Sequence, residues 1–420
     1  MIVRGPTALE RAARAGVHRV LRGLRSGRVE LHEAWSSERL SLGRGEPAVR
    51  VEVRSPEAYV DVARRRSVGL GQSYADGLWE TDELVVLCRL AAREVRRADP
   101  VRRRAAAIGR PFARLRQLSL VNTRRGARRN IAAHYDLGNE LFEQFLDRET
   151  MMYSSALFER EDASLEDAQL ARLERVCRRL ELVGDDHLLE IGTGWGGLAV
   201  HAASHHGCRV TTTTISREQR EYAQARVRAA GLEDRVTVLS ADYRDLDGRY
   251  DKLVSLEMIE AVGWQYLETF FRRCSELLES HGLFFLQAIA VEDGAYEAEK
   301  SARSFANQLI FPGGCLPSLE VIQRCLARVT DLRTVWLDDI SRSYVLTLQH
   351  WRRRFQAAAS RLAELGYDER FRRLWTFWLA LSEAGFSEAR IMDLQLLAAK
   401  PGRQRRVEAG LVAAPQAEPA

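Results

Sequence analysis

The chain has 420 residues, of which 46% are hydrophobic and 29% charged, and this composition excludes a disordered protein. No run of about 18 apolar residues occurs, which excludes a membrane-spanning helix, and residues 1–28 carry arginines where a secretory signal needs an apolar stretch. We therefore expect a cytoplasmic protein. The six cysteines form no CxxC pair and do not cluster with histidines, so we expect reduced, mostly buried thiols and no metal.

The formal net charge of +5 is distributed unevenly along the chain. Between Arg96 and Arg129 there are twelve arginines and one acid, Asp99, a net of +11 that leaves −6 for the rest. Such a segment suits a polyanion, either an anionic membrane surface or nucleic acid. An arginine-rich helix whose side chains are solvated or paired with acids elsewhere is an equally good interpretation.

The N-terminal part indicates a small α+β domain over residues 1–95. Met1 to about Val29 has the spacing of an amphipathic helix, which either lies on a membrane or, as we prefer, covers the core of its own domain. Glu30 to Val53 alternates like strands, and Pro56 to Cys88 returns to helical spacing around GLGQSYADGLWE. Residues 96–129 follow as a basic linker with helical pieces.

Beyond Asn130, strands alternate with helices, which predicts a doubly wound, Rossmann-like α/β domain over residues 130–401. Residues 402–420 have no periodicity and are expected to form a flexible tail. We expect helices at Arg217 to Ala230 and at Trp264 to Leu278. The expected strands are HLLEIGTG from His187, CRVTTTTIS from Cys208, RVTVLSADY from Arg235, YDKLVSLEM from Tyr250 and GLFFLQAIA from Gly282.

LLEIGTGWGG, residues 188–197, places three alternating glycines at the turn from the first of these strands into a helix. Such a turn lets a ligand approach the backbone beside the positive end of the helix, and it serves dinucleotides or S-adenosylmethionine. A dinucleotide site needs an acid at the end of the second strand, where this chain has Thr214, Ile215 and Ser216. The third strand instead ends in Asp242 and Tyr243, which favours S-adenosylmethionine.

The chain resembles the cyclopropane-fatty-acyl-phospholipid synthases and the related mycolic acid cyclopropane synthases. The resemblance covers about Asn130 to Pro401, with its motifs in family order, and GLGQSYADGLWE resembles the N-terminal domain of the full-length synthases. The matching motifs are NIAAHYDLGNELFEQFLD, MMYSSALF, LLEIGTGWGG, TISREQ, ADYRDL, EMIEAVG, IFPGGCLPS and SEAGF.

The resemblance implies a class I methyltransferase that transfers the methyl group of S-adenosylmethionine to a cis double bond of a phospholipid acyl chain. A carbocation forms and loses a proton as the cyclopropane ring closes. In the family the base is thought to be a bound bicarbonate, whose ligands project onto Glu260, Tyr344 and the main chain of Ile289. The implied cofactor contacts are Tyr153, Ser154, Leu188, Leu189, Glu190, Ile191, Gly192, Thr193, Gly194, Trp195, Gly196, Thr214, Ile215, Ser216, Arg217, Glu218, Gln219, Asp242 and Tyr243.

The chain departs from the family pattern at four positions of the implied site. Ser155 and Ser382 stand where cysteine is common, Ala261 replaces a histidine in the EHVG or EHFG motif, and Gln287 replaces the histidine of the fifth strand. A branch that includes plant synthases also has EMIEAVG with glutamine, so the changes at Ala261 and Gln287 resemble a subgroup signature. Glutamine donates a hydrogen bond to bicarbonate but cannot take a proton.

Several alternatives stay open from the sequence. A methyl-branching enzyme would form the same cation and lose a different proton, a nucleic-acid methyltransferase would use the basic segment, and an inactive relative would only bind lipid. We favour the lipid enzyme without nucleic acid, associated with the inner face of the membrane, and relatives suggest a homodimer. The site residues also have purely structural interpretations. In these, Glu260 pairs with an arginine, Tyr344 is a core tyrosine, and Trp375 and Trp378 are core residues. His134 and Tyr135 either pack near the cofactor entrance or cap a helix.

Overall fold

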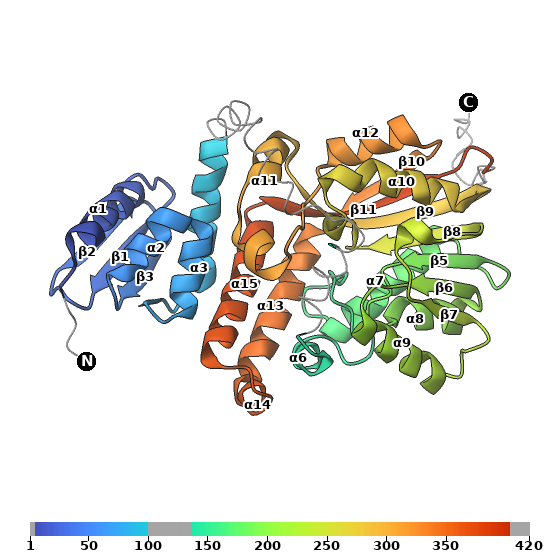
Figure 1. Ribbon diagram of the computed structural model, residues 1–420, viewed down its shortest axis with the longest axis horizontal. Helices are drawn as coiled ribbons and strands as arrows, with labels where there is room; N and C mark the ends of the chain where they lie inside the picture. Colours follow the sequence, from blue (N-terminus) through green and yellow to red (C-terminus); the bar gives the residue numbers. More distant parts are fainter. Residues whose placement is uncertain (1–4, 100–125, 127–136, 404–420) are drawn as a thin grey trace, which may run out of the picture.

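The computed structural model describes residues 5–99, 126 and 137–403 (Figure 1). Most of the basic linker, the residues His134 and Tyr135 and most of the predicted tail lie outside the described residues. Among the described helices, none combines the length and the apolar character needed to cross a membrane. At the start of the linker, Arg96 pairs with Glu292, and Asp99 pairs with Arg390.

The N-terminal part is a four-stranded sheet, in the order β2-β1-β3-β4, packed with helices. Thr7 and Glu10 form a capping box that starts the first helix. That helix ends at Arg22, before Gly23, and Val29 lies in the first strand, so the prediction of a helix to about Val29 is wrong at its C-terminal end. The elements are α1 (Ala8–Arg22), β1 (Gly27–Glu33), β2 (Arg39–Arg44), β3 (Ala48–Val53), α2 (Glu57–Arg65), α3 (Ser67–Ala75), β4 (Trp79–Glu80) and a helix over 84–99.

The apolar core of the N-terminal part continues into the C-terminal half of the chain. It includes Phe305 and, on α15 (Glu369–Ser387), Phe377. Gly71 on α3 marks the closest approach, because a Cβ there would lie 2.2 Å from the Phe305 ring and 2.9 Å from that of Phe377. This packing explains Gly71 of GLGQSYADGLWE, whereas Gly69 lies against the backbone of Asp61 on α2. The division into separate domains stays a prediction.

The C-terminal part is built on a seven-stranded sheet in the order β10-β11-β9-β8-β5-β6-β7. β11 pairs antiparallel with both of its neighbours, and the other paired strands run parallel. All five predicted strands are present, and two more complete the sheet. The strands are β5 (His187–Ile191), β6 (Arg209–Thr213), β7 (Val236–Leu239), β8 (Tyr250–Leu256), β9 (Leu278–Val291), β10 (Arg333–Asp339) and β11 (Ile391–Ala399).

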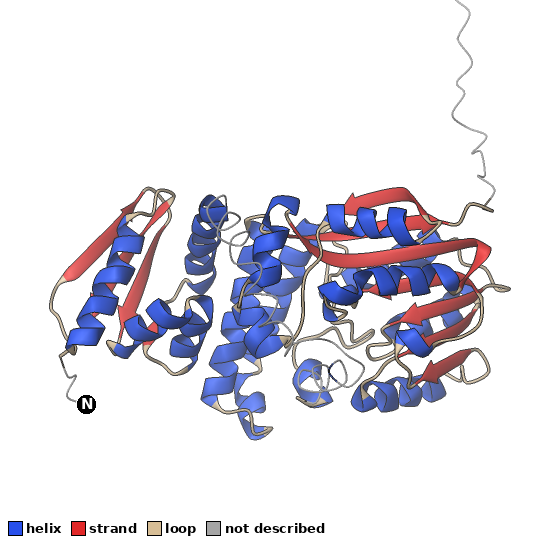
Figure 2. Cartoon of the chain, turned by 45° about the horizontal axis from the view of Figure 1, so that its top comes forward, coloured by secondary structure: helices blue, strands red, loops and turns tan. Residues whose placement is uncertain are grey.

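Helices cover both faces of this sheet (Figure 2). α7 (Leu165–Leu180), α8 (Gly197–His206) and α9 (Arg217–Ala229) pack on one face, and α10 (Leu267–Glu276) and α12 (Leu319–Val329) pack on the other. α13 (Ser341–Ala357) and α15 stand between the two sheets (Figure 1). Shorter helices are α6 (Asn139–Glu143), α11 (Tyr296–Ser301) and α14 (Ala359–Glu364). The three-layer arrangement confirms the predicted Rossmann-like fold class.

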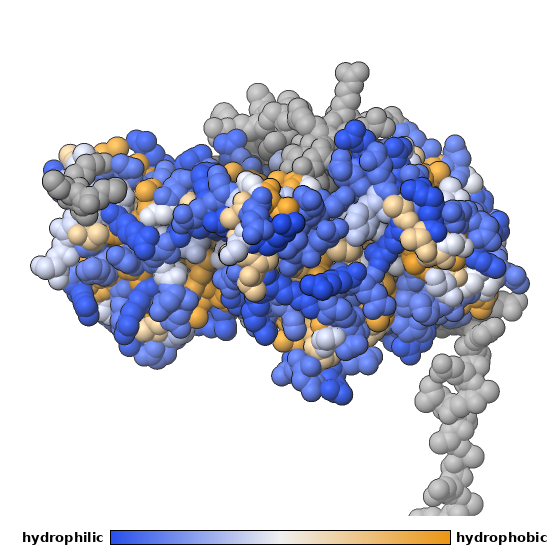
Figure 3. Space-filling model, turned by 90° about the horizontal axis from the view of Figure 1, so that it is seen from below, coloured by the Kyte–Doolittle hydropathy of each residue, from blue (hydrophilic) through white to orange (hydrophobic). Residues whose placement is uncertain are grey.

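The cysteines are free thiols, and five of the six are buried, as predicted. The premise that none clusters with histidines is wrong in three dimensions. α7 and α8 bring atoms of Cys177, His201 and His206 within 4.8 Å of one another. The face seen in Figure 3 is mainly hydrophilic, with smaller groups of hydrophobic residues between the hydrophilic ones.

Candidate active site

The glycine-rich turn lies at the carboxyl end of β5, where α8 begins. Gly192, Gly194 and Gly196 all have positive φ, at 108°, 52° and 84°, which explains the need for glycine at each position. The backbone N–H groups of Gly192 and Thr193 donate to the carbonyl of Thr213 at the end of β6. On the side where a Cβ of Gly194 would project, no heavy atom of the described residues lies within 4 Å. The turn is therefore open to a ligand.

The other predicted cofactor segments end the neighbouring strands on the same edge of the sheet. Ser216 caps α9, and the Thr214 hydroxyl donates to the side chain of Gln219. Asp242, after β7, is buried and accepts hydrogen bonds from the Arg244 guanidinium at 2.7 and 2.6 Å. The structure thus gathers the glycine turn, the β6 end and the β7 end at one edge, as a nucleoside site requires.

A buried acid, Glu190, is connected to the glycine turn by hydrogen bonds. Glu190 on β5 accepts a hydrogen bond from the Thr212 hydroxyl at 2.6 Å, and that hydroxyl lies 2.7 Å from the hydroxyl of Thr193 in the turn. Burial raises the pKa of Glu190 to about 8. Glu190, which the resemblance implied as a cofactor contact, is therefore linked to the turn through two threonines.

At the carboxyl end of β8, a cluster of hydrogen bonds converges on Glu257, which we did not predict as a site residue. Its Oε1 accepts from the backbone N–H of Ser155 at 2.8 Å and from Nε2 of Gln287 at 2.7 Å. Its Oε2 accepts from the Tyr344 hydroxyl at 2.6 Å. Three predicted catalytic groups, from a loop, β9 and α13, therefore meet at this one unpredicted carboxylate. Its position near the carboxyl end of the predicted strand YDKLVSLEM was the available signal.

Two further carboxyl groups lie beside Glu257. Glu260 accepts from the backbone N–H of Ile289 at 2.5 Å through Oε1, and its buried Oε2 has no hydrogen-bond partner among the described residues. Burial and the neighbouring charge of Glu257 raise the pKa of Glu260 to about 8. Burial, with the charges of Glu257 and Glu260, raises the pKa of Asp393 on β11 well above its usual value. Glu260 forms no ion pair with an arginine among the described residues.

One buried arginine supplies positive charge to this cluster. Arg172 on α7 is fully buried, and burial lowers its pKa, an effect that the charges of Glu257, Asp147, Asp393 and Glu190 only partly oppose. Its Nη2 donates to Gln169, whose amide donates to the carbonyl of Ser154. The predicted cofactor residue Ser154 is thus held by the same helix that places the arginine under the carboxylates.

Aromatic rings form the apolar surroundings of the cluster. The Tyr344 ring stacks on Phe386 at 4.3 Å between centroids, and Trp351 stacks on Tyr153 at 5.2 Å. Trp375 belongs to the same buried group, while Trp378 is only partly buried. Ser382, on α15, has a buried hydroxyl without a hydrogen-bond partner among the described residues. It lies one turn before Phe386 and shows no contact with the carboxylates.

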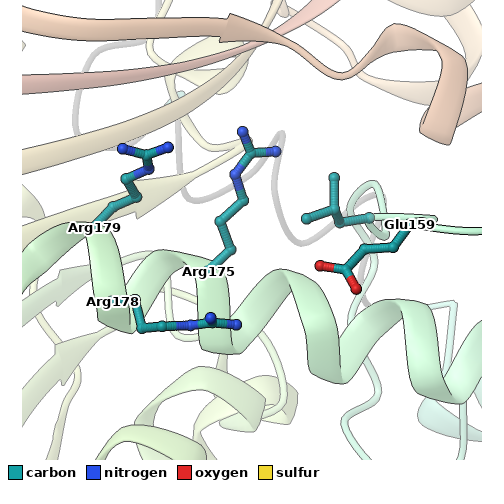
Figure 4. Close-up of a pocket in the computed structure, with 5 residues that line it drawn as sticks. Glu159, Arg175, Arg178 and Arg179 are labelled. Carbon is teal, nitrogen blue, oxygen red and sulfur yellow. The ribbon is translucent and has the colours of Figure 1, made fainter. Parts of the chain in front are cut away.

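A separate pocket of about 420 Å³ lies on the outer side of α7 (Figure 4). Its lining consists of Leu157, Glu159, Arg175, Arg178 and Arg179. Arg175 forms an ion pair with Asp338, and the Arg179 guanidinium lies 4.2 Å from the centre of the Trp336 ring. None of the predicted site residues lines this pocket. Arg175 and Arg179 contact β10, whereas Arg178 pairs with Glu174 on α7.

The strand order, the single reversed strand and the glycine turn define a class I, S-adenosylmethionine-dependent methyltransferase. Residues 122–396 match the family of mycolic acid cyclopropane synthetases, and the chain belongs to this family. It is 37% identical over 395 residues to the tuberculostearic acid methyltransferase UfaA1 of Mycobacterium tuberculosis, covering 92% of this chain and 90% of that protein. It is 35% identical to the cyclopropane-fatty-acyl-phospholipid synthase of Escherichia coli K12, covering 82% and 86%.

Solved structures agree with this assignment. The mycolic acid cyclopropane synthase CmaA1, complexed with SAH, has a TM-score of 0.61 and 27% identity, covering 65% of this chain and 98% of that one. MmaA2 from Mycobacterium tuberculosis gives the same TM-score at 26% identity. The protein is therefore an S-adenosylmethionine-dependent lipid methyltransferase, and S-adenosylmethionine is its cofactor.

Proposed function

We propose that this protein methylates the cis double bond of unsaturated acyl chains in membrane phospholipids and closes the cyclopropane ring. The observation that carries the proposal is the buried carboxylate cluster at Glu257, placed beside the glycine turn and walled by aromatic rings. In methylation of oxygen or nitrogen, a base removes the proton of the acceptor itself before or during attack, and that acceptor is polar. A carbon–carbon double bond carries no proton to remove before attack, but the cation that it forms must lose one afterwards.

The chemistry of an alkene explains the surroundings of the site. An alkene is a weak nucleophile, so the rate depends on alignment with the methyl group and on exclusion of water from the cation. The stacked pairs Tyr344 with Phe386 and Tyr153 with Trp351 exclude water and present π-faces that stabilise positive charge. The carboxylates add negative charge nearby, where it is needed only once the cation has formed.

S-adenosylmethionine supplies the methyl group when bound. We propose that the turn from Gly192 to Gly196 lies against its amino-acid portion, with the β6 end and Asp242 facing the nucleoside. The open space over Gly194 and the buried, unpartnered Ser154 hydroxyl among the described residues fit a polar ligand there. Asp242 already binds Arg244, so an adenine amino group would share that carboxylate.

The substrate is proposed to be reached from a membrane surface. The net +11 between Arg96 and Arg129 supports attachment to anionic lipid, with about 1 kcal/mol per arginine near the surface. The peripheral location at the inner face of the membrane and the homodimer rest on the resemblance. Nucleic acid is not part of this proposal, because the relatives that match most of the chain act on lipids by name.

Expression in a bacterial host without cyclopropane lipids tests the proposed function. We expect ring-containing fatty acids in the phospholipid fraction, measured by gas chromatography with mass spectrometry and by the ring protons in NMR. Gly192→Val is the inactive control, since Gly192 has a φ of 108° and a Cβ would lie 3.3 Å from Met258. Unchanged host lipids beside full-length, folded protein would contradict the proposal.

Methyl branching is the second candidate. The 37% identical relative, which covers 92% of this chain, is a tuberculostearic acid methyltransferase by name, and this observation favours a branched product. The same expression experiment separates the two functions. An exocyclic methylene or a methyl branch without ring protons would identify the branching enzyme.

A further inference from the structure

Glu257 fills the position to which the hydrogen-bond donors of the site point. The Ser155 backbone and the Tyr344 hydroxyl each have one hydrogen, and both are given to Glu257. The Gln287 amide has two, of which one goes to Glu257 and the other to Asp393 at 3.0 Å. The carbonyl oxygen of Gln287 in turn accepts from Gln395 at 3.0 Å, which fixes the amide orientation. No hydrogen of these three donors is left for a small oxyanion.

The backbone at Glu257 is held in an unusual conformation that aims the side chain at these donors. Its φ is 48°, in the left-handed region that residues other than glycine rarely adopt. Its N–H donates to the carbonyl of Gln287 at 2.8 Å, so β9 fixes both ends of the residue. Strained residues of this kind persist where the surrounding structure determines them, and they concentrate at functional sites.

The neighbouring groups leave the negative charge on Glu257. Tyr344, Ser155 and Gln287 all donate to it, whereas a single backbone N–H donates to Glu260 and a single amide to Asp393. Hydrogen bonds to a carboxylate favour its ionised form. Once Glu257 is ionised, its negative charge opposes the ionisation of Glu260 and of Asp393 nearby. Of the three carboxyl groups, Glu257 accepts the most hydrogen bonds, and the charge of Arg172 acts on it as well, so Glu257 is the group whose ionised form is best stabilised.

We propose that the Glu257 carboxylate is the base that completes the reaction, so that this protein needs no bound bicarbonate. This inference rests on the proposed function. The methyl C–H bond breaks, its electron pair forms the carbon–carbon bond to the cationic carbon, and the proton passes to a Glu257 oxygen. The cation becomes a neutral ring and the carboxylate becomes a carboxylic acid, which releases its proton to water after the product leaves.

The test measures methyl transfer from labelled S-adenosylmethionine to vesicles of dioleoyl phosphatidylglycerol and dioleoyl phosphatidylethanolamine by the purified full chain. In buffer freed of carbon dioxide, we expect the wild-type rate to stay within about twofold of the rate with added bicarbonate. Glu257→Gly suits the positive φ and opens a space lined by the three donors. We expect it to lose at least about 100-fold, the usual contribution of a general base, and to regain about tenfold with added formate.

Two further variants separate a base from a packing residue. Glu257→Gln keeps the side-chain volume but has no basic oxygen, so we expect low activity and no response to formate. Glu33→Gln makes the same change at another buried glutamate that accepts from a tyrosine, Tyr59, at 2.6 Å, and we expect wild-type turnover per folded molecule. Binding of S-adenosylmethionine, measured by calorimetry, shows that each variant is folded.

The outcomes distinguish this inference from the proposed function. Wild-type protein that binds S-adenosylmethionine and methylates no lipid would contradict the proposed function. A wild-type rate that falls about tenfold without bicarbonate would overturn the role of Glu257, as would near wild-type activity of Glu257→Gln. A folded Glu257→Gly variant that formate does not rescue would also overturn it, because the donors that hold the carboxylate remain in place.

Discussion

Removal of a single hydroxyl group at Tyr344 should impair catalysis without disturbing the fold. The ring of Tyr344 is buried and stacked on Phe386, and phenylalanine keeps both features. Only the 2.6 Å hydrogen bond to Glu257 is lost. A hydrogen bond to a charged group contributes about 1.5–3 kcal/mol, so Tyr344→Phe should slow turnover by about 10- to 150-fold if the charged form is needed in the rate-limiting step.

The pH profile of the same variant should shift in a direction that follows from the pKa of Glu257. Burial raises the pKa of Glu257, and the hydrogen bond from Tyr344 is the largest of the effects that lower it again. Without that hydrogen bond the pKa of Glu257 rises further. Because Glu257 must be ionised to accept a proton, the acid limb of the kcat profile should move to higher pH in Tyr344→Phe.

Tyr59→Phe is the matched control, since Tyr59 donates to the buried Glu33 at 2.6 Å outside the catalytic cluster. It should lower the free energy of unfolding and leave the pH profile of turnover unchanged. Methyl transfer to unsaturated vesicles, followed between pH 5 and 9, measures both variants. An acid limb that stays in place or moves to lower pH in Tyr344→Phe would refute the assignment of Glu257 as the ionised base.

Three more predictions test the packing and the charges of the fold in urea titrations. Gly71→Ala would press a methyl group into the Phe305 ring and should cost about 1–3 kcal/mol, whereas Gly16→Ala, with open space at its Cβ, should cost nothing. Burial opposes the ionisation of Glu33, but its hydrogen bonds outweigh burial and lower its pKa to about 2. The free energy of unfolding should therefore fall by about 3 kcal/mol as the pH falls from 4.5 to 2. Glu33→Gln should make the free energy of unfolding less dependent on pH in this range. Arg172→Leu should lower the free energy of unfolding by about 1–3 kcal/mol because Gln169 loses its hydrogen-bond donor and the buried carboxyl groups lose a nearby positive charge, and an unchanged free energy of unfolding would contradict that role.

Strands with an apolar run and a turn after them were predictable from the sequence. β5 and the second half of β9 are of this kind, because parallel strands buried on both faces are nearly continuous in apolar residues. β6 instead contains one valine and three threonines, which are β-branched residues typical of strands. β10 differs, since five of its seven residues are exposed and its alternation is weak. β11 is buried, but its place between β9 and β10 depends on pairing with residues about a hundred positions away, which no local pattern encodes. The C-terminal end of α1 was likewise not predictable from the local sequence pattern.

The site was predictable as a set of groups but not as a geometry. Tyr344, Gln287 and Ser155 do come together, but around Glu257, while Ile289 donates to Glu260. The motif EMIEAVG contains both glutamates, and spacing alone does not tell which one faces the donors. The left-handed backbone at the first glutamate decides it, and that conformation depends on the hydrogen bond to β9.

The identity of the base also bears on the product. After methyl transfer the cation either loses a methyl proton to close the ring or first shifts a hydride, which leads to a branch. The choice therefore depends on how fast a positioned base removes the proton compared with the hydride shift. Glu257 is fixed by three hydrogen bonds and a strained backbone, so no diffusion or binding step precedes proton removal. A fixed base would shorten the life of the cation, so the role that we propose for Glu257 agrees with the proposed ring product rather than with a branch.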